Sequence, residues 1–364
     1  MTSMLRSRRA RWVVPAVAIA GVAAAISGGA LLAGASSPTL PEKTAAELLA
    51  DMHNAEKQPF SGTLVQTSRL GLPDVPALEG DDHTTSLLSM LTGSNTARVW
   101  YVSPQEVRFS LMGAFDETNV IRDGSDMWIW YSSTNTADHL TLPAASALPE
   151  AAAAAKAPIT PSDAADRMLA EVDDSTEITV DGTAEVAGRA AYELVIGPRD
   201  DRSLIEDVRI AVDADTSMPL RFEINGRDGG DPAFEVGFTS VTFDEPSDDV
   251  FRFNPPPGAT VTERDLFDMM DMDRRPMLTG PPEVHGESWT SVLVVDDVSV
   301  PESGDDSGLA DALLAAGTRV EGSYGSGTLY ETALVSALLL DDGTLLVGAI
   351  TPDVLEETAE GLER

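Results

Sequence analysis

Residues 208–225 read VRIAVDADTSMPLRFEIN, and the spacing of their apolar side chains decides the fold class. Apolar residues stand at every second position in 208–212 and again in 222–224, with charged or small residues between them. A period of two, interrupted by turn residues, is typical of antiparallel strands that bury one face. The same alternation recurs in residues 107–111, 128–131, 192–196 and 234–238. The sequence therefore predicts an antiparallel sheet with an apolar face.

Two amphipathic helices accompany these strands. Thr44 and Glu47 form a capping-box pattern ahead of apolar residues at helical spacing, which predicts a helix that ends near Lys57. Thr160 and Pro161 predict the start of a second helix over residues 161–172, because Thr is a favoured N-cap and Pro a favoured first residue. We expect both helices to cover the concave face of a curved sheet.

The N-terminus predicts export. Residues 1–35 contain four arginines and no acidic residue, and an apolar run occupies residues 12–35. Ala33-Gly34-Ala35 fits the cleavage site of a signal peptide, but a run of about 24 residues is also long enough for a membrane anchor with a transmembrane helix. Because the positive flank stays in the cytoplasm, both interpretations place the body on the extracytoplasmic face of the plasma membrane, either anchored or released.

Composition divides the chain into four parts. Residues 1–41 are the predicted signal peptide or anchor with a short linker, and residues 42–258 are the predicted sheet domain. Three prolines at 255–257 end the strand series, since Pro cannot continue a central strand. Residues 259–282 are the predicted linker, and residues 283–364 a small C-terminal α+β domain that includes a strand at 289–295.

The charge of the chain excludes nucleic acid as a partner, and its lack of cysteine excludes several kinds of site. The protein has 60 acidic and 24 basic residues, a formal net charge of −36. Four of the basic residues lie in the N-terminal segment, so the exported body has 60 acidic against 20 basic residues. A body this negative repels phosphate backbones, and we expect no nucleic-acid partner. The absence of cysteine also excludes disulfides, thiolate metal sites and a lipid anchor on an N-terminal cysteine.

No pattern of catalytic or metal-ligating residues is visible. The four histidines, His53, His83, His139 and His285, are scattered without a ligand pattern, so we interpret them as surface or capping residues. The GSYGSG stretch at residues 322–327 comes nearest to a nucleophile elbow, but it lies between predicted strands and lacks a histidine partner. We therefore expect a non-catalytic protein without a cofactor or metal.

One apolar sheet face is the candidate binding surface. We expect a single aromatic-rich face that the helices close. Two interpretations stay open: an ordinary core sealed by the helices, or a cavity that accepts an acyl chain or another apolar ligand. The candidate ligand-binding residues are Phe109, Leu111, Trp128, Trp130, Met168, Leu169, Phe222, Ile224, Phe234 and Phe238.

Several short motifs resemble those of one superfamily. They are TAAELL at 44–49, FSGTL at 60–64, RDG at 122–124, WIWY at 128–131, LTLP at 140–143 and FRFNPPPGA at 251–259. Over residues 42–259 the chain resembles the LolA-like superfamily: lipoprotein carriers, mycobacterial lipid-carrying lipoproteins, and the sensor domain of the RseB/MucB sigma-factor regulators. The resemblance implies an α+β fold class, with an unclosed antiparallel β half-barrel whose concave face is covered by helices.

The resemblance leaves two functions open. The first is binding of lipid or lipoprotein acyl chains in the cell envelope, as a carrier or chaperone. The alternative is an envelope-stress sensor that regulates a membrane-bound anti-sigma factor, because residues 283–364 loosely resemble the second domain of the RseB-type regulators. The expected partners are thus a lipid or acylated protein, and in the second case a membrane-bound regulator.

Overall fold

The computed structural model describes residues 40–71, 93–113, 115–142, 160–162, 165, 169, 172–264, 282–298 and 317–362. In this part of the chain, no helix combines the length and the apolar character needed to cross a membrane. The N-terminal signal peptide or anchor lies outside the described residues, so it stays a prediction.

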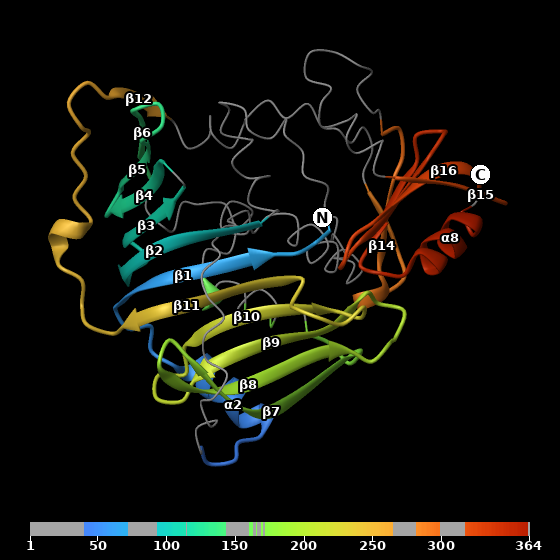
Figure 1. The fold of residues 1–364 in the computed structure, drawn as a ribbon, viewed down its shortest axis with the longest axis horizontal. Helices are drawn as coiled ribbons and strands as arrows, with labels where there is room; N and C mark the ends of the chain where they lie inside the picture. The colour runs from blue at the N-terminus through green and yellow to red at the C-terminus, as the bar shows by residue number, and fades with distance from the viewer. Residues whose placement is uncertain are drawn as a thin grey trace, which may run out of the picture.

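The largest unit of the described chain is one twelve-stranded sheet (Figure 1). The strands follow the order β12-β6-β5-β4-β3-β2-β1-β11-β10-β9-β8-β7, and all neighbours are antiparallel except β12 and β6. The strands are β1 (Phe60–Ser68), β2 (Gly93–Ser103), β3 (Glu106–Met112), β4 (Glu117–Asp123), β5 (Asp126–Tyr131), β6 (Thr136–Thr141), β7 (Thr176–Val186), β8 (Arg189–Pro198), β9 (Ile205–Asp213), β10 (Pro219–Gly226), β11 (Phe234–Thr242) and β12 (Thr260–Arg264).

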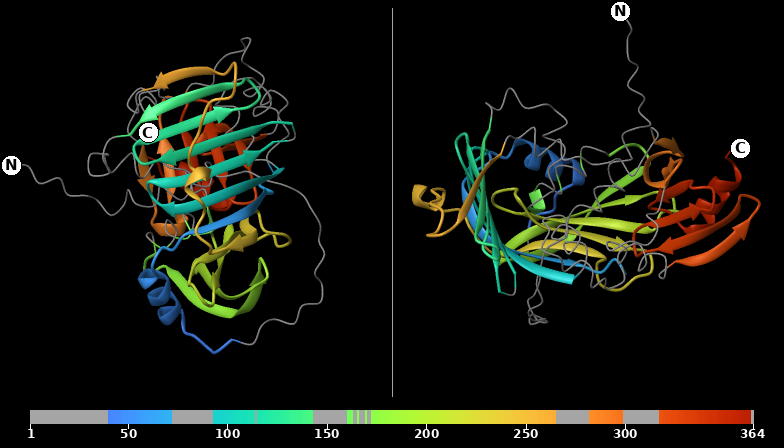
Figure 2. Two further views of the ribbon diagram at one scale, coloured as in Figure 1. Left: turned by 90° about the vertical axis from the view of Figure 1, so that its left-hand side faces the viewer. Right: turned by 90° about the horizontal axis from the view of Figure 1, so that it is seen from above.

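The sheet is strongly curved and does not close on itself, which confirms the predicted fold class (Figures 1 and 2). Helix α2 (Ala45–Asn54) lies on the concave side. Its capping box is formed as predicted: the Glu47 N–H donates to Thr44 Oγ1 at 3.2 Å, and the Thr44 N–H donates to the Glu47 carboxylate at 2.8 Å. The helix ends at Asn54 rather than near Lys57, because Ala55 already has an extended backbone.

A β-bulge bends the centre of the sheet, where β1 meets β11. The pairing shifts between Thr63 and Leu64, so the two strands twist more strongly at this point. Gly62 lies beside the bulge, and a Cβ atom there would come within 2.6 Å of the Ser240 carbonyl oxygen and 2.7 Å of the Phe238 ring. Only glycine permits this close approach of the two strands.

The C-terminal part of the chain forms a second sheet with its own small core. Its order is β13-β14-β18-β17-β16-β15, and every pair is antiparallel. Helix α8 (Pro352–Glu360) packs on this sheet through the buried Leu355 and Ala359. The strands are β13 (Glu283–His285), β14 (Val292–Val295), β15 (Thr318–Gly322), β16 (Gly325–Glu331), β17 (Ser336–Leu340) and β18 (Leu345–Gly348).

The two sheets are joined by backbone hydrogen bonds. The Leu204 N–H donates to the Ala349 carbonyl, and the Thr351 N–H donates to the Arg202 carbonyl, both at 3.0 Å. The Ala333 N–H donates to the Leu70 carbonyl at 2.9 Å. The second domain is therefore held against one end of the large sheet in a fixed orientation.

Side chains of the second domain also complete the core of the first. Trp289 is 6% exposed, and its Nε1–H donates to Thr176 Oγ1 of β7 at 2.9 Å. Leu334 is fully buried in the same cluster. The hydrophobic core of the large sheet is thus built from both domains.

Two further sequence expectations need correction here. The sequence predicts one strand over residues 289–295, but Trp289 lies in a 3-10 turn, η6 (Ser288–Thr290), and only Val292–Val295 pair. Part of the predicted linker 259–282 is instead the edge strand β12, which pairs in parallel with β6. Alternation does not reveal β12 because all five of its residues are exposed, so no buried face marks it.

We predict that the Trp289→Ala variant loses about 3–5 kcal/mol of unfolding free energy, because it deletes a large side chain from a shared core. Urea unfolding, followed by fluorescence and by circular dichroism, would measure the loss. Val261→Ala is the control: Val261 is 42% exposed on β12, and surface changes cost within about 0.5 kcal/mol. Equal midpoints for Trp289→Ala and wild type would show that the interface adds nothing to stability.

Candidate ligand-binding face

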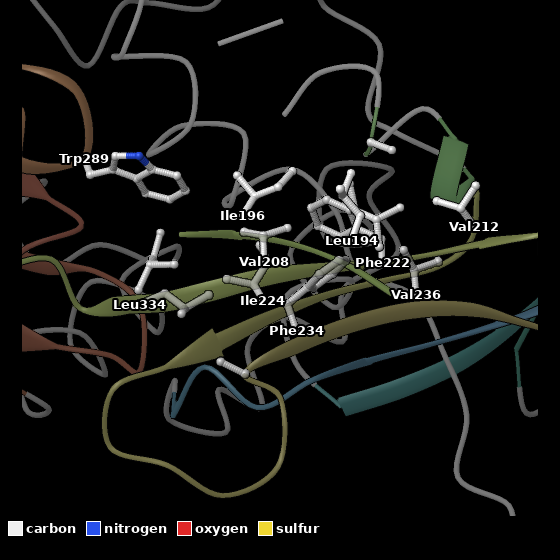
Figure 3. Close-up of a cluster of buried hydrophobic side chains, with 14 of the residues drawn as sticks. Leu194, Ile196, Val208, Val212, Phe222, Ile224, Phe234, Val236, Trp289 and Leu334 are labelled. Atoms are coloured by element: carbon white, nitrogen blue, oxygen red, sulfur yellow. The ribbon is translucent and has the colours of Figure 1, made fainter. Parts of the chain in front are cut away.

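The concave side of the large sheet carries the main hydrophobic core, which we call the inner core. Figure 3 shows its side chains on one side of the β8–β11 strands, with Trp289 and Leu334 from the second domain at one end. Its buried members are Leu48, Leu70, Ala165, Tyr192, Leu194, Ile196, Ile205, Val208, Ile210, Val212, Phe222, Ile224, Ala233, Phe234, Val236, Trp289 and Leu334.

Four of the ten candidate residues meet in the inner core. Phe222, Ile224 and Phe234 are between 5% and 8% exposed. The Phe222 and Phe234 rings lie edge to face with their centroids 6.5 Å apart. Leu169, from the second predicted helix, packs against the same cluster. The structure therefore places these four side chains together, and their contact with a ligand stays a prediction.

Three more candidates lie in a second hydrophobic cluster, around β1, β2 and β3. Phe238 is buried at the β1–β11 bulge, where it pairs with Leu64, and Phe109 and Leu111 pack partly buried against the same cluster. Phe238 follows Val236 of the inner core by two residues on β11, so the two side chains share one face of the strand. The cluster that holds these three candidates is separate from the inner core and also contains Ala191 and Ala211.

Trp128 and Trp130 lie on the opposite, outer side of the sheet. Phe109 pairs with Val120, which pairs with Ile129, so Ile129 shares the face of Phe109. Adjacent residues of a strand point to opposite faces, so both tryptophans point outward. The expectation of a single aromatic face is wrong for these two residues. All four residues of the β5 segment WIWY are large and apolar or aromatic, so alternation alone could not tell its inner face from its outer one.

An outer segment, residues 244–258, runs across the outer side of the sheet toward β12 (Figure 2). The Phe253 ring packs against both of them, at centroid distances of 5.3 and 6.1 Å. Arg108 of β3 donates to the carbonyl oxygen of Val250 at 3.1 Å. These contacts give the outer aromatic residues a structural role in holding the segment that leads to β12.

Helical residues cover the inner core. Leu48 of α2 is 1% exposed within it, and the Tyr192 hydroxyl donates to the Pro41 carbonyl at 3.0 Å just before the helix. The Lys43 ammonium lies 4.8 Å from the centre of the Tyr192 ring. From the second predicted helix, Ala165 is fully buried. Met168 lies outside the described residues, so its place on this face stays a prediction.

One polar side chain is buried in the middle of the concave face. Gln66 of β1 is 2% exposed, and it pairs across the strands with Val236 and Asn95. Among the described residues, neither its Nε2 nor its Oε1 has a hydrogen-bond partner. Sequence reasoning missed Gln66, although a glutamine two residues after Leu64, at an inward position of a strand, was a visible signal.

The outer face of β8–β11 is charged rather than apolar. Arg221 lies 2.6 Å from the Glu193 carboxylate and 2.8 Å from the Glu223 carboxylate. Glu223 is only 9% exposed, and it pairs across the strands with Arg209 and Glu235. Burial raises the pKa of Glu223 to about 7; Arg221 opposes the shift, and Glu235 and Glu193 add to it.

The described residues show no group of three or more His, Cys, Asp or Glu placed to hold a metal ion. His139 stacks on Trp128 at a centroid distance of 4.1 Å. Its Nδ1 lies 2.9 Å from the Glu263 carboxylate and its Nε2 lies 3.0 Å from the Asp126 carboxylate. His139 therefore connects β6, its own strand, with β12 and β5. The expectation of a non-catalytic protein stays a prediction.

Comparisons with known proteins agree with an envelope location. A family model described as "Predicted periplasmic protein (DUF2092)" matches residues 78–263, just over half of the 364-residue chain. No curated protein matches the sequence.

Three solved structures illustrate the likeness of fold. A chain of the MucA/MucB complex of Pseudomonas aeruginosa is 16% identical, with 86% of this chain and 96% of that chain covered and a TM-score of 0.41. An uncharacterized conserved protein from Thermus thermophilus is 13% identical, with coverages of 60% and 99% and a TM-score of 0.33. A LolA superfamily protein from Nitrosomonas europaea is 12% identical, with coverages of 58% and 99% and a TM-score of 0.22. MucB and the LolA superfamily are the groups that the sequence motifs resemble, and this likeness concerns the fold alone.

We predict that Glu223 makes stability fall as the pH rises from about 5 to 8. Its folded-state pKa of about 7 lies above the ordinary value of 4.5, so the folded protein keeps a proton that the unfolded chain has lost. The stability from this proton is complete below about pH 4.5 and is lost as the pH rises through 7. Relative to Glu223→Gln, the wild type should lose about 1–3 kcal/mol over this range.

Urea unfolding of both proteins at several pH values would measure this loss. Glu331→Gln is the control, because it removes an exposed carboxylate from the second domain. Parallel stability curves for wild type and Glu223→Gln would contradict the prediction.

Proposed function

We propose that this chain, which belongs to the DUF2092 family of predicted periplasmic proteins, is a non-catalytic envelope protein that binds lipid or lipoprotein acyl chains. The binding surface is the concave side of the large sheet. The protein reaches the envelope by export through its N-terminal segment, which either stays as an anchor or is cleaved.

One observation carries the proposal: among the described residues, the apolar concave face is covered by helical residues and by a few side chains of the second domain. The inner core spans β8–β11, and its described covering residues come from α2, from Ala165 and Leu169, and from the second domain. Helical segments on an open sheet can move away while the strands keep their ladder hydrogen bonds. An acyl chain could then take the place of the helix side chains against the same apolar surface.

The competing interpretation is an ordinary core. In that case the inner-core residues contact only one another and their cover, and no ligand is needed. The two interpretations differ in what a polar substitution in the cover does. If the cover seals a core, the substitution lowers the unfolding free energy of the protein. If the cover can move, the substitution instead weakens ligand binding.

We predict that Leu169→Asp removes binding of a fluorescent fatty acid and changes the unfolding free energy of the empty protein by less than about 1 kcal/mol. The reason is that a movable helix can turn an introduced charge toward water. If the helix seals a core, the same charge is buried and the cost is about 2–4 kcal/mol. Fluorescence titration and urea unfolding of the delipidated protein measure the two effects.

The control variant is Val261→Asp, on the exposed edge strand β12, which should alter neither property. Mass spectrometry of organic extracts from the purified wild type provides an independent check. An extract without lipid, together with a wild type that binds no fatty acid, would refute the proposal.

A second candidate function is the regulation of a membrane-bound partner. The observation that favours it is the C-terminal domain, which shares a core with the large sheet through Trp289 and Leu334. A change of the cover over the inner core could therefore reach the second domain through direct contacts. Two of the solved MucB structures are complexes with MucA. For this chain we propose a membrane-bound regulator as the partner.

If the protein regulates a membrane-bound partner, we predict that the full-length protein captures a transmembrane protein from membranes of its own cells. Added fatty acid should change the amount captured. Cross-linking followed by mass spectrometry would measure this. Trp289→Ala, which weakens the contact between the domains, should lose the effect of fatty acid. Recovery of no transmembrane protein by the wild type would exclude this function.

A further inference from the structure

We propose that Gln66 selects ligands whose polar head group can both donate and accept a hydrogen bond, such as a long-chain primary amide or a protonated long-chain carboxylic acid. This inference rests on the proposed function, because it assigns the position of the head group on the concave face. It adds a specificity-determining residue and a chemical class of ligand.

The burial of Gln66 is the first step. The side chain is 2% exposed, and both of its amide atoms lack a hydrogen-bond partner among the described residues. Nearly all buried polar groups in proteins have a partner, because an unpaired donor or acceptor loses its bonds to water without replacement. An amide with both atoms unpaired therefore indicates a missing partner that pairs with each of them.

The position of Gln66 points to a ligand on the concave side. It stands on β1 between Leu64 and Ser68, and the alternate positions of the strand place all three on one face. Its cross-strand neighbour Val236 belongs to the inner core, and Leu64 belongs to the cluster around β1 and β2. Gln66 is thus a polar point between two apolar surfaces that together could accommodate an acyl chain.

The cross-strand neighbours do not provide the missing partner. Val236 is apolar, and the structure records no hydrogen bond between Gln66 and its other neighbour, Asn95. On the opposite face of β1, by contrast, the next side chain is paired: Thr67 Oγ1 lies 2.9 Å from Ser94 Oγ. The unpaired state is therefore a property of the concave face at this position.

The chemistry of the amide defines the class of head group. Nε2 donates and Oε1 accepts, and the two atoms are bonded to the same planar carbon at the end of the side chain. A primary amide or a protonated carboxylic acid presents a complementary donor and acceptor, so both pairs form at once. An ester carbonyl can only accept, which leaves Oε1 unpaired, and an alkane leaves both atoms unpaired.

The test is a displacement assay with an apolar fluorescent dye, N-phenylnaphthylamine, bound to the delipidated full-length protein. Palmitamide and methyl palmitate compete with the dye; they share one acyl chain, and both are uncharged at all working pH values. We expect palmitamide to displace the dye at about tenfold lower concentration than the ester, the difference that one to two hydrogen bonds supply.

The variant Gln66→Met keeps the size of the side chain and removes both amide atoms. It should bind the two compounds with affinities equal within about twofold, and its Tm without ligand should rise, because an unpaired polar group is gone. Ser110→Ala is the matched control, since Ser110 is a buried polar residue on the outer face of β3, and it should keep the wild-type preference. Where Gln66→Met fails to fold, Gln66→Leu replaces it; its side chain can neither donate nor accept a hydrogen bond, so the preference should again be lost.

Each outcome separates this inference from the proposed function. If wild type and Gln66→Met bind both compounds with the same ratio, Gln66 does not pair with the head group and the inference is overturned, while lipid binding stands. If the wild type binds neither the dye nor either compound, the proposed function itself fails. A tenfold preference that the methionine variant loses and the Ser110→Ala control keeps would establish the inference.

Discussion

The rest of the structure depends on burying the concave face of an open twelve-stranded sheet. A sheet that does not close exposes its apolar face unless other elements cover it. Here α2 covers one part through Leu48, and the second domain covers one end through Trp289 and Leu334. The second domain thus forms its own sheet and also contributes side chains to the core of the large sheet. Its backbone hydrogen bonds to Leu70 and Arg202 hold it against the large sheet.

The outer side of the sheet is covered in a different way. Along β3–β6 the outer segment packs Phe253 against Trp128 and Trp130 and then continues into the edge strand β12. Along β8–β11 the outer face carries salt bridges such as that between Arg221 and Glu193. The outer side is thus occupied by aromatic residues under the outer segment and by paired charges, and the main hydrophobic core lies on the concave side. This asymmetry makes the concave side the best candidate for ligand binding.

Gln66 places a polar group on this apolar surface, and such a group could orient a bound ligand. In a core that only stabilises the fold, a buried amide without partners lowers stability, and an apolar residue would fit better. On a ligand-binding face the same amide can orient a bound molecule, because one end of the ligand pairs with it and the other end does not. The bulge between Thr63 and Leu64 lies two residues before Gln66, and Gly62 allows β11 to come close to β1 beside it.

The sequence by itself determined the strands with a clear buried face and the capped helix. The strands around Leu194, Ile210 and Phe222 were predictable because alternation follows directly from the geometry of a half-buried strand. The Thr44 capping box was predictable for the same local reason. The signature of the fold class lies in such local patterns.

Only the tertiary structure decided which face is concave and what covers it. In β5 the apolar residues occupy both phases, so the outward position of Trp128 follows from pairing with β4 and not from the local pattern. β12 has no buried face and forms because β6 offers a free edge. Trp289 enters a core more than a hundred residues away in sequence, and Gln66 is buried because distant strands and segments surround it. These features depend on contacts between segments far apart in the chain, which no local spacing of residues records.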